Sequence, residues 1–139
     1  MKLVNTLLQL AVVGLLCLAP AFAQTSANIV VDVPFAFQVG DQKLPAGEYN
    51  MKAAGGSNLL LVRNDEGKAI VLALTTTNPT GNAPKVAQAR FRVYGDAHFL
   101  AGIYVPGTDG RYLQKSHAEG KAAEGKSPIE VAVIAIPGR

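Results

Sequence analysis

Residues 29–40 read Ile-Val-Val-Asp-Val-Pro-Phe-Ala-Phe-Gln-Val-Gly, and this stretch decides the fold class. Apolar side chains occupy every odd position of 29–39, while Asp32 is one of the residues between them. Alternation with period two is typical of a strand that has one buried face. Pro34 lacks the backbone N–H that a sheet ladder uses, so we expect an edge strand or a bulge there.

The segments 59–64 and 68–75 predict the best-defined hairpin of the chain. The loop between them is Asp65-Glu66-Gly67, in which Gly67 would take the left-handed conformation of a three-residue hairpin loop. This register pairs apolar residues across the hairpin, namely Val62 with Ile70 and Leu60 with Leu72. Residues 69–74 are apolar on both faces, so we expect this strand at the centre of the sheet.

Other strands follow at short intervals. Gly40-Asp41 predicts a turn, and a strand at 48–53 should follow it. A second hairpin is predicted through a three-residue loop, Gly95-Asp96-Ala97, and a last strand covers 129–136. The second hairpin would pair Val93 with Phe99 and Phe91 with Ala101, with all odd residues on one face. His98 would then face outward.

Length and composition fit one small domain. The chain has 139 residues, of which 49% are hydrophobic and 17% are charged, and its formal net charge is +3. About seven short strands separated by turns predict an all-β fold, either an antiparallel β-sandwich or a small, partly open barrel. The segment 107–127 is polar and Gly-rich, so we expect a flexible loop near 107–127, with at most one helical turn near Leu113. A charge of +3 without a basic patch makes nucleic acid an improbable partner.

Residues 1–23 have the features of a cleaved signal peptide. Lys2 precedes an apolar run, and Ala21-Phe22-Ala23 fits the small-residue pattern ahead of a cleavage point. Cleavage after Ala23 would leave a single domain at 24–139, with no transmembrane segment. The protein would then be exported, to the periplasm or to the medium.

Two other interpretations of this N-terminus are weaker. A membrane anchor needs about 20 apolar residues, and the run here is shorter and has no basic cluster after it. Lipid attachment at Cys17 is disfavoured because two leucines precede it and because it lies inside the apolar run. Cleavage would remove this cysteine, the only one in the chain, and with it all disulfide and thiol chemistry.

Two motifs resemble a family of small exported bacterial β-proteins. The first is Val33-Pro34-Phe35-Ala36-Phe37-Gln38-Val39-Gly40, and the second is Leu44-Pro45-Ala46-Gly47-Glu48-Tyr49. Family members carry V-P-F-x-F-x-V-G followed by L-P-A-G-x-Y, and a later aromatic-Gly-Asp turn is matched by Tyr94-Gly95-Asp96. The family is functionally uncharacterised. The resemblance therefore implies export and an all-β fold, and it assigns no catalytic residue.

Arg90 and Arg92 are the strongest candidates for a contact site. Both should point outward from one strand, where they could hold an anion or a partner such as an envelope protein, an acidic glycan or a lipid headgroup. The alternative is that they protect an edge strand against aggregation.

No set of residues predicts catalysis, a cofactor or a metal. His98 and His117 have no second histidine or cysteine close in sequence, as a zinc site would require. Asp65-Glu66 lies at a turn tip, and the neighbours Ser116-His117 are poorly placed for a nucleophile and its base. We therefore expect a non-enzymatic binding or structural module of the cell envelope. The alternative is a small-molecule or lipid carrier with a barrel cavity, and an enzyme of unrecognised type is a third, weaker one.

Overall fold

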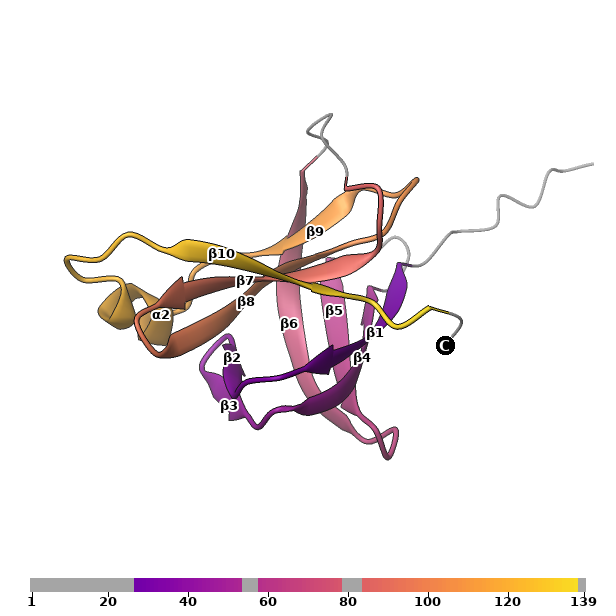
Figure 1. Cartoon of the computed structure of the whole chain (residues 1–139), viewed down its shortest axis with the longest axis horizontal. Helices are drawn as coiled ribbons and strands as arrows, with labels where there is room; N and C mark the ends of the chain where they lie inside the picture. The colour runs from indigo at the N-terminus through magenta and orange to yellow at the C-terminus, as the bar shows by residue number, and fades with distance from the viewer. Residues whose placement is uncertain (1–26, 54–57, 79–83, 138–139) are drawn as a thin grey trace, which may run out of the picture.

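The computed structural model describes residues 27–53, 58–78 and 84–137 (Figure 1). The predicted signal peptide lies outside these residues. Within them the chain forms ten strands and one short helix: β1 (Asn28–Val33), β2 (Phe37–Val39), β3 (Gln42–Leu44), β4 (Gly47–Ala53), β5 (Leu59–Asn64), β6 (Ala69–Asn78), β7 (Gln88–Tyr94), β8 (Ala97–Tyr104), β9 (Gly110–Leu113), α2 (His117–Ala122) and β10 (Ile129–Ile134).

The ten strands form one continuous mixed sheet that bends on itself without closing. Its main path runs β1-β4-β5-β6-β9-β8-β2-β3, and β7 and β10 extend it from β8. Strand β6 joins the two halves, because it pairs with β5 along 69–74 and with β9 along 75–78. Figure 1 shows β5 and β6 running across the direction of β7, β8 and β10. The predicted all-β class is confirmed, and its geometry is compatible with a sandwich or an open barrel.

Pro34 divides the stretch that was predicted as one strand. Strand β1 ends at Val33, and β2 begins at Phe37 and joins the other half of the sheet, where Gln38 forms a parallel bridge to Phe99. Among the described strands β1 pairs with β4 alone, so it is an edge strand, as the proline predicts. This division is one reason why the described strands outnumber the expected seven.

The hairpin of β5 and β6 keeps its predicted loop but not its predicted register. Gly67 has a φ of 78°, which is the left-handed conformation expected of it. A bulge between Val62 and Arg63 shifts the ladder by one residue, so the pairs are Val62 with Val71 and Leu60 with Ala73. The predicted pairs were wrong because the bulge places both Ile70 and Val71 against the core.

The β7–β8 hairpin also differs from its prediction by one residue. Tyr94 pairs with Ala97, so the loop has two residues, and Gly95 supports it with a φ of 61°. A second bulge lies at Arg90/Phe91, and the resulting pairs are Val93 with His98, Arg92 with Phe99, and Phe91 with Leu100. Phe99 and Ala101 were predicted to face the core from this strand. Leu100, which lies between them, packs in the core cluster instead.

The segment expected to be a flexible loop near 107–127 contains two ordered elements. Strand β9 pairs with both β6 and β8, and it approaches β8 so closely that a Cβ on Gly102 would lie 2.3 Å from the carbonyl oxygen of Arg111. Helix α2 follows β9 (Figure 1). The helix at 117–122 was not predicted because Gly120 within it and Gly125 after it lower helix propensity, whereas a buried contact of Glu119 stabilises it.

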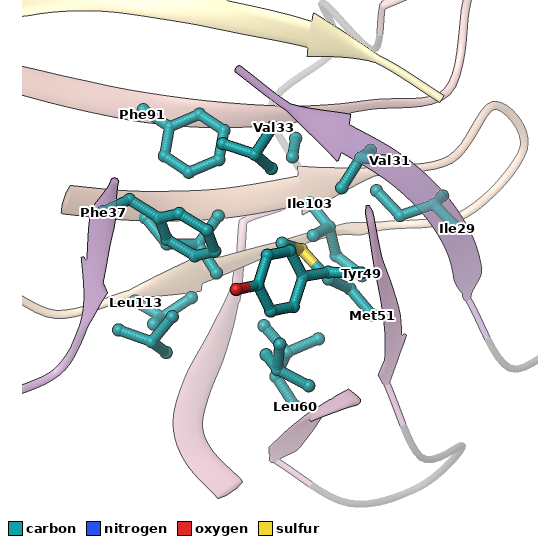
Figure 2. Packing of buried hydrophobic residues seen from close by; sticks show 14 of the residues in the cluster. Ile29, Val31, Val33, Phe37, Tyr49, Met51, Leu60, Phe91, Ile103 and Leu113 are labelled. Atoms are coloured by element: carbon teal, nitrogen blue, oxygen red, sulfur yellow. The ribbon is translucent and has the colours of Figure 1, made fainter. Parts of the chain in front are cut away.

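The hydrophobic core lies between the two halves of the sheet. Figure 2 shows side chains from both halves converging there. Phe37 stacks edge-on against Tyr49 and against Phe91, with ring centroids 5.1 and 5.3 Å apart. The odd positions of β1 and β4 supply much of the rest, as the alternation predicts: Ile29, Val31, Val33, Tyr49 and Met51 are all buried.

Candidate functional site

Helix α2 lies over the hairpin end of β7 and β8, where a buried carboxylate holds it. Glu119 is only 2% exposed. Its carboxylate accepts hydrogen bonds from Nε of Arg92 and, at 2.9 Å, from Nη2 of the same guanidinium. The hydroxyl of Tyr94 donates a third bond to this carboxylate, at 3.0 Å. A buried charge with this many partners is well compensated.

Local contacts position α2 for this role. The hydroxyl of Ser116 accepts the N–H of Glu119 at 3.1 Å and so caps the helix. The carboxylate of Asp41, at the tip of the β2–β3 hairpin, accepts the N–H of Ala118 at 3.1 Å. Helix α2 is therefore tied both to the sheet beneath it and to the hairpin beside it.

The same contacts shift two pKa values. The hydrogen bond to Glu119 raises the pKa of Arg92, which keeps its guanidinium charged. Burial, and next the hydrogen bond to Glu119, raise the pKa of Tyr94 above its usual value. Both shifts favour the protonation states that hold the cluster together.

Arg90, the second predicted contact residue, also lies in an intramolecular cluster. Its guanidinium carbon is 4.4 Å from the centroid of the Tyr104 ring, which indicates a cation–π contact. The ring of Tyr112 packs edge-on against Tyr104 at 5.2 Å. Burial is the main cause that raises the pKa of Tyr104, followed by the hydrogen bond to Tyr112.

The two arginines thus share one face of β7 as predicted, but each makes a contact within the chain. Strand β10 pairs with β7, so β7 is not the edge strand that the alternative interpretation required. The side chain of Arg92 is 14% exposed. An anion or partner contact at Arg90 and Arg92 stays a prediction.

The residues screened for catalysis lie apart. The ring of His98 stacks on Phe35 at 4.1 Å, so the prediction that His98 faces outward was wrong, because the loop is one residue shorter than expected. His117 is exposed at the start of α2, and Asp65 and Glu66 are exposed at the turn tip. In the ranges that the structure describes, no three His, Cys, Asp or Glu side chains gather as a metal site would need.

A groove of about 840 Å³ opens between β6 and the β2–β3 hairpin. The tip of the hairpin forms one wall, the 71–76 part of β6 forms the other, and the end of β9 closes the groove at Leu113 and Gln114. Its size lies in the range of small-ligand sites.

Two leucines on the β6 wall are strongly exposed. Leu72 is 60% exposed and Leu74 is 76% exposed. They pair across the ladder with Leu61 and Leu59 of β5, so four leucines share the outer face of these two strands. Neighbouring exposed apolar side chains of this kind are typical of interaction surfaces. We call Leu59, Leu61, Leu72 and Leu74 the leucine patch.

The groove also contains a buried polar atom without a partner. Thr75 is only 3% exposed, and among the described residues its Oγ1 makes no hydrogen bond. Thr75 lines the groove beside the leucine patch. A buried hydroxyl without a partner costs free energy, so a ligand that bonds to it would gain from doing so.

This groove was not predicted from the sequence. The segment 69–74 was predicted at the centre of the sheet, but among the described strands only β5 pairs with it, because β9 joins β6 from Thr75 onward, and its outer face is exposed. The one signal was the pair of facing leucine runs in β5 and β6, and such runs also fit a strand buried on both faces.

No membrane-spanning helix occurs within the described residues. Comparison of the chain with protein-family models, with curated proteins and with solved structures finds no match.

Proposed function

We propose that the protein is an exported, non-enzymatic binding module of the cell envelope and that it binds its partner in the groove between β6 and the β2–β3 hairpin. The observation that carries this proposal is the exposure of Leu72 and Leu74 along an open apolar groove. Binding would remove both side chains from water, and burial of apolar surface contributes roughly 25 cal/mol per Å². Export rests on the signal-peptide pattern of residues 1–23.

The cluster of ionisable side chains under α2 supports a binding role over a catalytic one. Arg92, Tyr94 and Glu119 bond to one another beneath α2. Catalytic groups are usually aimed at a cleft where a substrate can reach them, whereas these three hold an element of the fold in place. The cluster is therefore explained by stability.

A carrier of small molecules or lipids is the second candidate. The volume and the apolar wall of the groove favour it, because both suit an acyl chain or a small apolar compound. An open groove leaves part of such a ligand in water, which favours the binding module over the carrier.

Native mass spectrometry of the protein purified from its own periplasm or medium tests the proposal. We expect a bound species on the wild-type chain, and we expect it to be lost from the double variant Leu72→Lys/Leu74→Lys. Ile134→Lys is the matched control, since Ile134 is also an exposed apolar strand residue, at 52% exposure on β10. A species that stays on the double variant, or a wild-type chain that carries none, contradicts the proposal. N-terminal sequencing of the exported protein should begin at Gln24.

A further inference from the structure

The edge of β6 that borders the groove offers backbone groups to which no described strand pairs. The N–H of Thr75 donates to the carbonyl of Asn58 on the β5 side, at 2.7 Å. Backbone groups alternate between the two edges of a strand, so the N–H and C=O of Leu74 and Leu72 point away from β5. Among the described strands, β9 pairs with β6 only from Thr75 onward. The 69–74 segment therefore has an open edge.

This open edge lacks the usual protection against strand pairing. Residues 70–76 contain no charged residue and no proline, and their β-branched side chains favour extended structure. Native edges normally carry a charge, a proline or a cover, because an unprotected edge pairs with other chains. An open, uncharged edge is thus suited to receive a strand.

The chemistry of the groove favours a polypeptide over a lipid. Asp41 is the only charged residue among the described lining residues, and its carboxylate already accepts the N–H of Ala118. The lining thus offers no cation to hold a phosphate headgroup. The Oγ1 of Thr75 has no partner among the described residues, and a peptide group could supply one where an acyl chain could not.

The walls of the groove favour a single strand over a second copy of this chain. A second copy that paired through its own β6 would bring its β5 along, one strand spacing of about 4.8 Å further out. The β2–β3 hairpin stands on that side, and it is fixed there by the bridge of Gln38 to Phe99. A lone extended segment needs no such room.

We propose, as a refinement of the binding function above, that the groove accepts one extended segment of a partner polypeptide, which adds as a strand to the 69–74 edge of β6. The guest pairs with the N–H and C=O groups of Leu72 and Leu74. One set of its alternating side chains lies beside these leucines, and the other set covers Val71 and Ala73 at the border of the core. A group of the guest binds the hydroxyl of Thr75.

Selection from a phage-displayed library of random ten-residue peptides, followed by amide hydrogen exchange measured by NMR, tests this inference. We expect enriched peptides with alternating apolar residues. Bound peptide should slow exchange of the Leu72 and Leu74 amides at least tenfold and leave those of Val71 and Ala73 unchanged, since these already face β5. Thr75→Val should weaken peptide binding by about 2- to 10-fold, the value of one hydrogen bond.

A parallel titration with sodium laurate separates this inference from the binding function itself. If laurate shifts the groove resonances while no peptide is enriched, the strand inference is overturned and the groove remains a binding site. If neither probe binds, both proposals fail. Protection of the Leu72 and Leu74 amides that rises with protein concentration alone would assign the edge to a second copy and overturn the inference.

Discussion

The two halves of the sheet treat their outer faces in opposite ways. On β7 and β8, helix α2 covers the hairpin end of the face, and Glu119 is satisfied there by Arg92 and Tyr94. On β5 and β6 the face carries the leucine patch, and Leu72 and Leu74 remain exposed beside an open strand edge. An element of the chain thus lies over the outer face of one half of the sheet, and the leucines on the outer face of the other half stay exposed. The uncovered half is the better candidate for binding.

The largest expected effect comes from removing the buried charge of Glu119, which holds α2 on the sheet. Glu119→Gln removes the carboxylate and leaves the guanidinium of Arg92 without its counter-ion. Breaking a buried pair in this way costs about 3–5 kcal/mol, and urea unfolding should show the loss. Glu124→Gln is the control, because Glu124 is exposed just after α2 and should change stability by less than about 0.5 kcal/mol.

The paired substitution Glu119→Leu/Arg92→Met sharpens the same test. Replacing a buried ion pair with apolar side chains is often close to neutral, so most of the lost stability should return. A Glu119→Gln variant as stable as the wild type would show that the pair does not hold α2.

A second test compares leucines on opposite faces of neighbouring strands. Leu60 is 0% exposed, so Leu60→Ala should cost about 2–5 kcal/mol through the cavity it leaves. Leu72→Ala removes a side chain that is mostly in water already, and its cost should stay below about 1 kcal/mol. Both values come from urea unfolding. Equal losses of stability would mean that Leu72 is covered in solution. The outer face of β5 and β6 would then not be the exposed one.

Alkaline pH offers a third, smaller test of the covered face. Tyr94→Phe removes a hydrogen bond to a charged group and should cost about 1.5–3 kcal/mol at neutral pH. Since folding raises the pKa of Tyr94, the tyrosine contribution is complete below the ordinary pKa of about 10. It is lost as the pH rises above that value, because the unfolded chain then ionises first.

Urea unfolding at pH 9 and pH 11 measures this dependence. The wild type should lose more stability over that interval than Tyr94→Phe does. The same loss in both proteins would exclude Tyr94 as a source of the pH dependence.

The smallest expected effect is a gain in the covering helix. Gly120 lies within α2, and a Cβ there would meet no atom within 4 Å. Gly120→Ala should therefore raise the unfolding free energy by about 0.5–1 kcal/mol. Gly125→Ala is the contrasting variant, because Gly125 has a φ of 67° and should lose stability. A Gly120→Ala variant without any gain would indicate that α2 is frayed in solution.

The alternation of residues 29–39 and the turn glycines predict much of the fold, but not its registers. Strands β1, β4, β5 and β6 and the left-handed Gly67 follow from local patterns that each residue carries with it. The bulges at Val62/Arg63 and Arg90/Phe91 do not, because one inserted residue depends on which side chains the opposite sheet can accept. Two register predictions were wrong for that reason.

The sequence by itself determined that this chain is all-β, where its main turns lie and which faces of β1 and β4 are buried. Only the tertiary structure decided which apolar residues stay in water. Leu60 and Leu72 are the same residue in adjacent strands, yet the core covers one, and no described element covers the other. Coverage depends on elements far apart in the chain: a buried Glu119 brings α2 over one face, and nothing comparable in the described ranges lies over the leucine patch.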